Sequence, residues 1–164
     1  MMRVLIKGIV GLVVVLVVLV AGLFVYARSH DGPIALIPGG PLEAGELVGE
    51  VPDDWGFAAD VEEVELQLAY EDSSRTTWIV VSEGAAFIPC SLSFPPGKRW
   101  HLAADADGTA IVRISGKRYA VALERVKDDA RAATVAQAIA AKYPAAAGRG
   151  GEGLWVFELR PRGV

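Results

Sequence analysis

The sequence has few of the residues that build disulfide bonds and metal sites. Its 164 residues include one cysteine, Cys90, so no disulfide can form within the chain. Its two histidines, His30 and His101, are far apart in sequence, and with a single cysteine they do not make a usual zinc ligand set. The sequence therefore predicts no metal site and a domain that depends on its hydrophobic core.

Basic residues are missing from one long part of the chain. Residues 29–72 include 12 acidic residues and no lysine or arginine, whereas residues 73–164 include 13 basic and 8 acidic ones. Two interpretations stay open: two solvated surfaces of opposite sign, or cations that serve an anionic ligand. The overall net charge of −4 and the lack of a basic stripe argue against nucleic acid as a partner.

Motifs that identify a catalytic site are also absent. The chain contains no P-loop, no nucleophile elbow and no HExxH pair of zinc ligands. Whether the protein is an enzyme therefore stays open at this level.

A long apolar run lies near the start of the chain. Residues 8–27 carry no charge, and 14 of these 20 residues are Val, Leu, Ile or Phe. Twenty helical residues at about 1.5 Å each span the hydrocarbon core of a bilayer. The many valines would favour a strand in water, but in lipid the backbone has to satisfy its own hydrogen bonds and forms a helix. The run therefore predicts a transmembrane helix, with the lipid bilayer as its partner.

A cleavable signal peptide is the alternative for this run, with Val25 and Ala27 as the small residues before the cut. The apolar region of a signal peptide usually has about 7–15 residues. Here the run is longer, and the bulky Phe24 and Tyr26 lie close to the cut. We therefore expect an uncleaved anchor.

The positive charges around the run predict its orientation. Arg3 and Lys7 precede the run, and Arg28 alone follows it directly. Because an excess of lysine and arginine stays on the cytoplasmic side, the N-terminus is expected inside. The prediction is a single-pass protein of the cell (inner) membrane, with its globular domain on the outer side.

The chain divides into an anchor at 1–28, a Pro/Gly-rich tether at 29–45 and a globular domain at 46–164. The prolines and glycines of the tether argue against a helix or a central strand. The segment is either a loose tether or an extended arm. Ile34, Leu36 and Ile37 would let it pack on the domain.

Most of the globular domain has the patterns of β-strands. Alternating apolar and polar residues predict a half-buried strand at 64–68, and β-branched and aromatic residues predict a buried one at 76–82. Glu83-Gly84 and Ser115-Gly116-Lys117 are turn signals. Further strands are expected at 86–91, 109–114, 118–126 and 154–159. The domain is therefore predicted to be a small, mostly antiparallel β-barrel.

One helix is predicted in the C-terminal half, at 128–143. Asp128 and Asp129 suit its positive end and Lys142 its negative end, and Pro144 follows it. The side chains expected to face the sheet are Ala133, Val135, Ala136, Ile139 and Ala140. The predicted fold class is mostly β (α+β): a transmembrane helix, then an antiparallel split β-barrel with this helix.

The densest group of polar residues lies at 82–84 and 90–101. Its hydroxyls and cations at strand ends suit a phosphate, and Trp100 could stack on a ring. The alternative is an ordinary Pro-Pro-Gly loop with cations that face water. Cys90, in an apolar strand, is expected to be buried and not reactive, and His101 is either a loop residue or a proton shuttle.

The order of elements from about 66 to 143 carries a family resemblance. Ser73-Ser74-Arg75 comes before a strand, Ser82-Glu83-Gly84 before the next, and Lys98-Arg99-Trp100-His101-Leu102 before a hairpin at 111–126; Asp128 and a helix follow. This order resembles the FMN-binding split-barrel superfamily, which includes pyridoxamine-phosphate-oxidase-like and deazaflavin-dependent nitroreductase-like proteins.

The resemblance implies a cofactor, FMN or a deazaflavin phosphate, and a membrane-tethered reductase that forms a homodimer. The cofactor-binding positions that it implies are Arg75, Ser82, Lys98, Arg99 and Trp100. It indicates no catalytic residue. Two other hypotheses stay open: a non-catalytic split-barrel module that binds another envelope protein or a small ligand, and a purely structural envelope protein.

Overall fold

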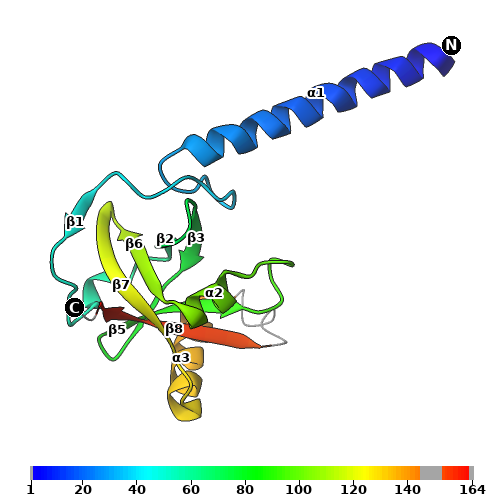
Figure 1. Cartoon of the computed structure of the whole chain (residues 1–164). Coiled ribbons are helices and arrows are strands. Elements are labelled where there is room, and N and C mark those ends of the chain that lie inside the picture. Colours follow the sequence, from blue (N-terminus) through cyan, green and yellow to red (C-terminus); the bar gives the residue numbers. More distant parts are fainter. Residues whose placement is uncertain (1, 145–152, 163–164) are drawn as a thin grey trace.

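The computed structural model describes residues 2–144 and 153–162, and Figure 1 shows a β domain from which one long helix extends. That helix, α1 (Met2–Ser29), is continuous, as the apolar run predicts. Within its segment Ile6–Ser29, the apolar stretch of 18 residues has a mean hydropathy of 3.2 and is not buried against the rest of the chain. The helix is thus long and apolar enough to cross a membrane, although a signal sequence has the same properties.

The β domain is built on one curled sheet that forms half a barrel. Its strand order is β3-β2-β6-β7-β8-β5-β4, and every pair along this path is antiparallel; β1 (Glu46–Val48) pairs with β7 in parallel. The strands of the path are β2 (Glu63–Leu68), β3 (Ser74–Trp78), β4 (Val80–Ser82), β5 (Ala85–Ser91), β6 (Thr109–Ile114), β7 (Lys117–Arg125) and β8 (Leu154–Pro161). The predicted antiparallel β architecture is confirmed in this form, and membership of the split-barrel superfamily stays a prediction.

Two tight turns set the register of the hairpins. Glu83 and Gly84 have φ of 53° and 78° between β4 and β5, and Ser115 and Gly116 have 49° and 79° between β6 and β7. Positive φ at both central residues is the requirement of a type I′ turn, whose twist matches that of the strands. Both predicted hairpins are therefore confirmed.

The expected single strand at 76–82 is wrong, because the chain changes partners at Ile79. β3 pairs with β2, whereas β4 pairs with β5, so these consecutive strands form opposite ends of the sheet order. Ile79 alone joins them and is fully buried. The curl of the sheet thus brings its two ends together at this residue.

A second difference is the short helix α2 (Trp100–Ala106), in a segment that the sequence analysis treats as a loop. The helix has only seven residues, fewer than an isolated helix needs. His101 and Ala104 are buried in the domain, and this packing stabilises the helix. A further short element, the 3₁₀ turn η1 (Gly56–Ala58), lies before β2.

Helix α3 (Asp129–Lys142) confirms the predicted C-terminal helix. Asp128 caps it and accepts a hydrogen bond from the backbone N–H of Arg131 at 2.7 Å. The predicted apolar face is only partly right. Val135 and Ile139 are buried, but three of the expected residues are exposed: Ala133, Ala136 and Ala140.

The segment before β1 is an arm that packs on the sheet. Leu42 is buried, its N–H donates to Gln67 Oε1 at 2.8 Å, and Ser74 Oγ donates to the carbonyl of Gly40 at 2.6 Å. The apolar contact thus comes from Leu42 and not from Leu36, which is 88% exposed. The arm interpretation is therefore right: Leu42 is its buried anchor, and of the three residues expected to pack, Ile34 and Ile37 are half-buried.

Candidate functional site

Three of the five predicted cofactor residues come together at one end of the sheet. Arg75 lies on β3, and its guanidinium carbon is 5.7 Å from the ring centre of Trp100, the first residue of α2. Lys98 precedes α2, and the positive charges of Lys98 and Arg75 both act on the thiol of Cys90. We call Arg75, Cys90, Lys98, Trp100 and His101 the basic-aromatic cluster.

Ser82 lies outside this cluster. It pairs with Ala85 at the first residue of β5, whereas Lys98 donates to the carbonyl of Ser91, at the last residue of the same strand. Six residue steps of about 3.3 Å separate these two ends by about 20 Å. Ser82 and Lys98 therefore cannot contact the same phosphate.

The cations of the predicted site already have partners within the protein or face water. Lys98 Nζ donates to the carbonyls of Ser91 and Phe94, and Arg75 forms an ion pair with Glu71. Arg99 is exposed. Lys98 thus holds the loop between β5 and α2 closed, and Arg99 is the cation that this loop offers to the solvent.

The interior of the cluster contains polar atoms without partners. His101 is 8% exposed, and its ring lies 5.2 Å from that of Trp155. Among the described residues, His101 Nδ1 and Arg75 Nε are buried and have no hydrogen-bond partner. By sequence alone His101 is either a loop residue or a proton shuttle, because no local pattern predicts the burial that α2 produces.

Burial dominates the ionisation of the two titratable groups next to Lys98. Desolvation raises the pKa of the Cys90 thiol to about 11, against the opposing effect of Lys98 and Arg75. Desolvation lowers the pKa of His101, and the positive charge of Lys98 lowers it further. Cys90 is therefore a protonated, buried thiol, as the sequence predicts, and His101 is held in its neutral form.

Arg125, on β7, borders the cluster and was not singled out from the sequence. Its guanidinium carbon lies 3.5 Å from the ring centre of Trp155, and its Nη1 is 3.5 Å from Asp105 Oδ2. A strand arginine within an alternating pattern gives no sign of such a contact, since the pairing of β7 with β8 creates it.

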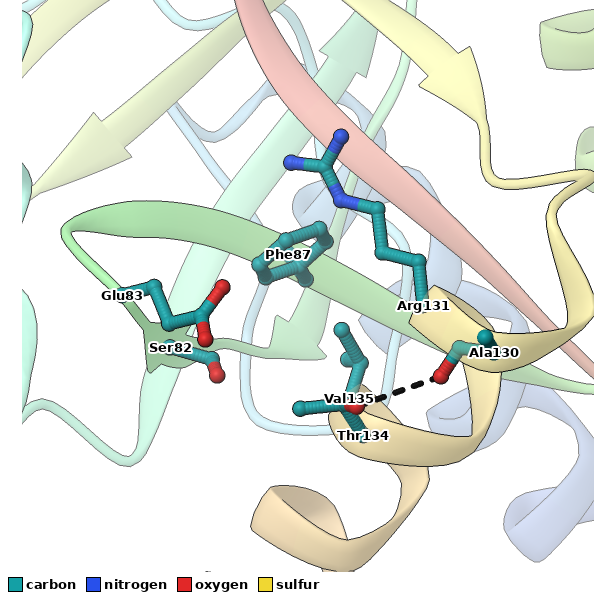
Figure 2. A pocket seen from close by; sticks show the side chains of 7 residues that line it. All are labelled: Ser82, Glu83, Phe87, Ala130, Arg131, Thr134 and Val135. Atoms are coloured by element: carbon teal, nitrogen blue, oxygen red, sulfur yellow. Dashed lines mark hydrogen bonds between the residues drawn. The ribbon is translucent and has the colours of Figure 1, made fainter.

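Ser82 instead lines a pocket between the β4–β5 hairpin and α3 (Figure 2). The pocket has a volume of about 390 Å³, and its lining residues are Ser82, Glu83, Phe87, Ala130, Arg131, Thr134 and Val135. Arg131 extends over the ring of Phe87 and pairs with Glu158 at 2.9 Å. Because Glu158 neutralises this arginine and Glu83 lines the pocket, the pocket does not favour an anion.

Within residues 2–144 and 153–162, no group of three or more His, Cys, Asp or Glu side chains is arranged to hold a metal ion. No protein-family model matches the chain, and no curated protein matches it either. The site is therefore interpreted from its own geometry and chemistry.

Proposed function

We propose that the protein is a single-pass membrane protein whose β domain is a non-catalytic binding module, held close to the membrane surface. The observation that carries the proposal is that the chain directly after the apolar helix α1 is bound to the sheet. Ala27, near the end of the helix, is fully buried, and the N–H of Gly40 donates to the carbonyl of His30 at 2.9 Å.

Arg113 completes this connection. It binds Asp31 in the arm at 2.6 Å and also pairs with Glu65 on β2, and its side chain is only 10% exposed. Asp31 Oδ1 accepts the N–H groups of Glu43 at 2.7 Å and Ala44 at 3.2 Å. A loose tether would not form such contacts. They keep the arm on the sheet and so hold the domain close to the bilayer.

The non-catalytic part of the proposal has its support in the predicted cofactor residues. Lys98 and Arg75 are engaged by the protein's own carbonyl and carboxylate oxygens, and Ser82 lies about 20 Å from Lys98 along β5. A phosphate would have to displace these contacts from Lys98 and Arg75. Without Ser82 it would also form fewer contacts with the protein than the split-barrel resemblance implies.

Membrane retention of the mature full-length chain tests the proposal. We expect the chain to float with lipid vesicles and to resist extraction at alkaline pH, and we expect Val14→Lys/Val17→Lys to abolish both properties. The matched control is Val48→Lys, outside α1. N-terminal sequencing of the mature protein provides the second readout: a chain that begins at Arg28 contradicts the uncleaved anchor.

A second candidate function is the binding of a flavin or deazaflavin phosphate at the basic-aromatic cluster. Two observations favour it: Arg75 and Trp100 lie together, and Arg75 Nε and His101 Nδ1 have no partner among the described residues. A charge-assisted hydrogen bond contributes about 1.5–3 kcal/mol, so the loss of one should weaken binding about tenfold or more.

Titration of the detergent-solubilised full chain with FMN and with a deazaflavin phosphate separates the two candidates. Saturable micromolar binding that weakens tenfold in Arg75→Gln and stays unchanged in Ser82→Ala supports the cofactor. Ser82→Ala is the matched control because Ser82 lies outside the cluster. If the folded chain binds neither compound, the non-catalytic module is the better explanation.

A further inference from the structure

We propose that the loop between β5 and α2, residues 92–99, is a second membrane contact, and that it binds the anionic headgroups of phospholipids at the bilayer surface. We call this segment the β5–α2 loop. The inference rests on the proposed membrane anchor and adds a site that the anchor alone does not imply.

The loop presents apolar groups to the solvent. Phe94 is 65% exposed, Pro95 and Pro96 are exposed beside it, and Leu102 on α2 is 47% exposed. Proline has no N–H group, so two residues of the loop carry no backbone donor that would lose water on entering the interface. Lys98 Nζ binds the carbonyl of Phe94, which leaves one acceptor fewer to desolvate.

The charge of the loop is of one sign. Residues 84–104 include Lys98 and Arg99 and no acidic residue, although the whole chain has a net charge of −4. Arg99 is exposed, next to the apolar tip. Cations that adjoin exposed aromatic and aliphatic side chains are the combination that binds anionic lipid at the interface, since the apolar groups enter and the cations meet the headgroups.

The position of the loop agrees with this role. In Figure 1, α1 leaves the domain toward the upper right, and the loop before α2 projects from the right-hand side of the domain. Gly40 donates to the carbonyl of His30, and Arg113 on β6 binds Asp31, so the chain that directly follows α1 is held on the domain. Insertion of α1 therefore holds the domain near the membrane surface, and the loop lies on the side of the domain toward which α1 extends in Figure 1.

A depth measurement on the full-length protein tests the inference. The single cysteine is replaced in Cys90→Ala, and Ser93→Cys then carries an environment-sensitive fluorophore at the exposed base of the loop. Ala133→Cys, an exposed position on α3, carries the same label as the control. The protein is reconstituted into phosphatidylcholine vesicles with about 30% phosphatidylglycerol and with nitroxide-labelled lipid, as suits an anionic surface.

We expect the label at position 93 to be quenched at least threefold more strongly than the label at position 133. Phe94→Ser/Arg99→Gln should reduce this quenching to the control level, and Phe57→Ser, which alters another exposed phenylalanine, should not. Vesicles of phosphatidylcholine alone should give weaker quenching at position 93.

The outcomes distinguish this inference from the proposed function. Flotation of the labelled chain without quenching at position 93 overturns the second contact and leaves the anchor intact, and it points to a protein as the occupant of the loop. A chain that does not float with the vesicles overturns both. Equal quenching in the two lipid mixtures contradicts the role of the anionic headgroup.

Discussion

Lys142 and Tyr143, at the end of α3, reach across the domain to main-chain oxygens. Lys142 Nζ donates to the carbonyls of Ala59 at 2.7 Å, Val61 at 2.6 Å and Ile79 at 3.0 Å, and Tyr143 OH lies 2.6 Å from the carbonyl of Ile79. Trp78 stacks on the Tyr143 ring at 4.7 Å. These contacts fix the rotation of α3 on the sheet, which explains why Val135 and Ile139 are buried and their alanine neighbours are not.

The first prediction concerns Lys142. Lys142→Met removes a charged donor from three carbonyls, and we expect the free energy of unfolding to fall by about 1.5–3 kcal/mol. Urea unfolding of the detergent-solubilised chain, followed by tryptophan fluorescence, measures this. The matched control is Lys127→Met at an exposed lysine, which should change stability by less than about 0.5 kcal/mol. An equal effect of both variants contradicts the role of Lys142.

His101 provides a prediction of pH dependence. Desolvation, and then Lys98, lowers the pKa of His101 in the folded protein below its ordinary value of 6.5. The unfolded chain therefore binds the proton more readily, so this contribution to stability is fully present above pH 6.5 and is lost as the pH falls from there through the lower pKa of the folded state.

His101→Gln should flatten the fall in the urea midpoint between pH 7 and pH 5, because glutamine does not titrate. Leu102→Gln, at an exposed position of the same helix, should keep the slope of the unmodified protein. A slope that His101→Gln leaves unchanged shows that other groups cause the acid sensitivity.

At the scale of elements, the arm before β1 depends on one arginine of β6. Arg113 binds Asp31 and Glu65, and its Nη1 donates to the carbonyl of Ala44 at 3.2 Å. Burial raises the pKa of Asp31, but the N–H groups of Glu43 and Ala44 and the Arg113 guanidinium outweigh it and hold that pKa below its ordinary value. The arm thus owes its position to polar contacts between segments that are distant in sequence.

Arg113→Met should release the arm. We expect backbone amide exchange in residues 31–45 to become about tenfold faster or more, since hydrogen bonds to charged groups contribute about 1.5–3 kcal/mol each. Hydrogen-exchange mass spectrometry measures the change. Lys117→Met is the control, because its pair with Glu46 is exposed and spans 4.0 Å. Unchanged exchange in the arm would contradict the assignment.

At the scale of the whole molecule, the charges beside α1 predict the side on which the β domain lies. Arg3 and Lys7 precede the apolar run and Arg28 alone follows it, so we expect the domain outside the cytoplasm. A reporter that is active only outside the cytoplasm, fused after Val164, should be active. The fusion with a cytoplasmic reporter should be silent.

Arg3→Glu/Lys7→Glu removes the charge bias and should weaken this preference, so that part of the population activates the cytoplasmic reporter. Arg160→Gln, far from the helix in sequence, is the control. An active cytoplasmic reporter on the unmodified chain contradicts the orientation.

The sequence by itself determined the local features of this protein. The apolar run predicted α1, the Glu83-Gly84 and Ser115-Gly116 pairs predicted two hairpins, and Asp128 predicted the start of α3. Each depends on a physical rule that acts within a few residues: hydrophobic length, the φ that a turn requires, or a capping hydrogen bond.

Only the tertiary structure decided which distant residues meet. The break of the expected strand at Ile79 follows from the curl of the sheet, and α2 exists because His101 and Ala104 are buried there. The same curl brings Arg75 to Trp100. The length of β5 separates Ser82, at one end of that strand, from Lys98, at the other end. Such contacts join strands that are not neighbours in sequence, so no local pattern of residues encodes them.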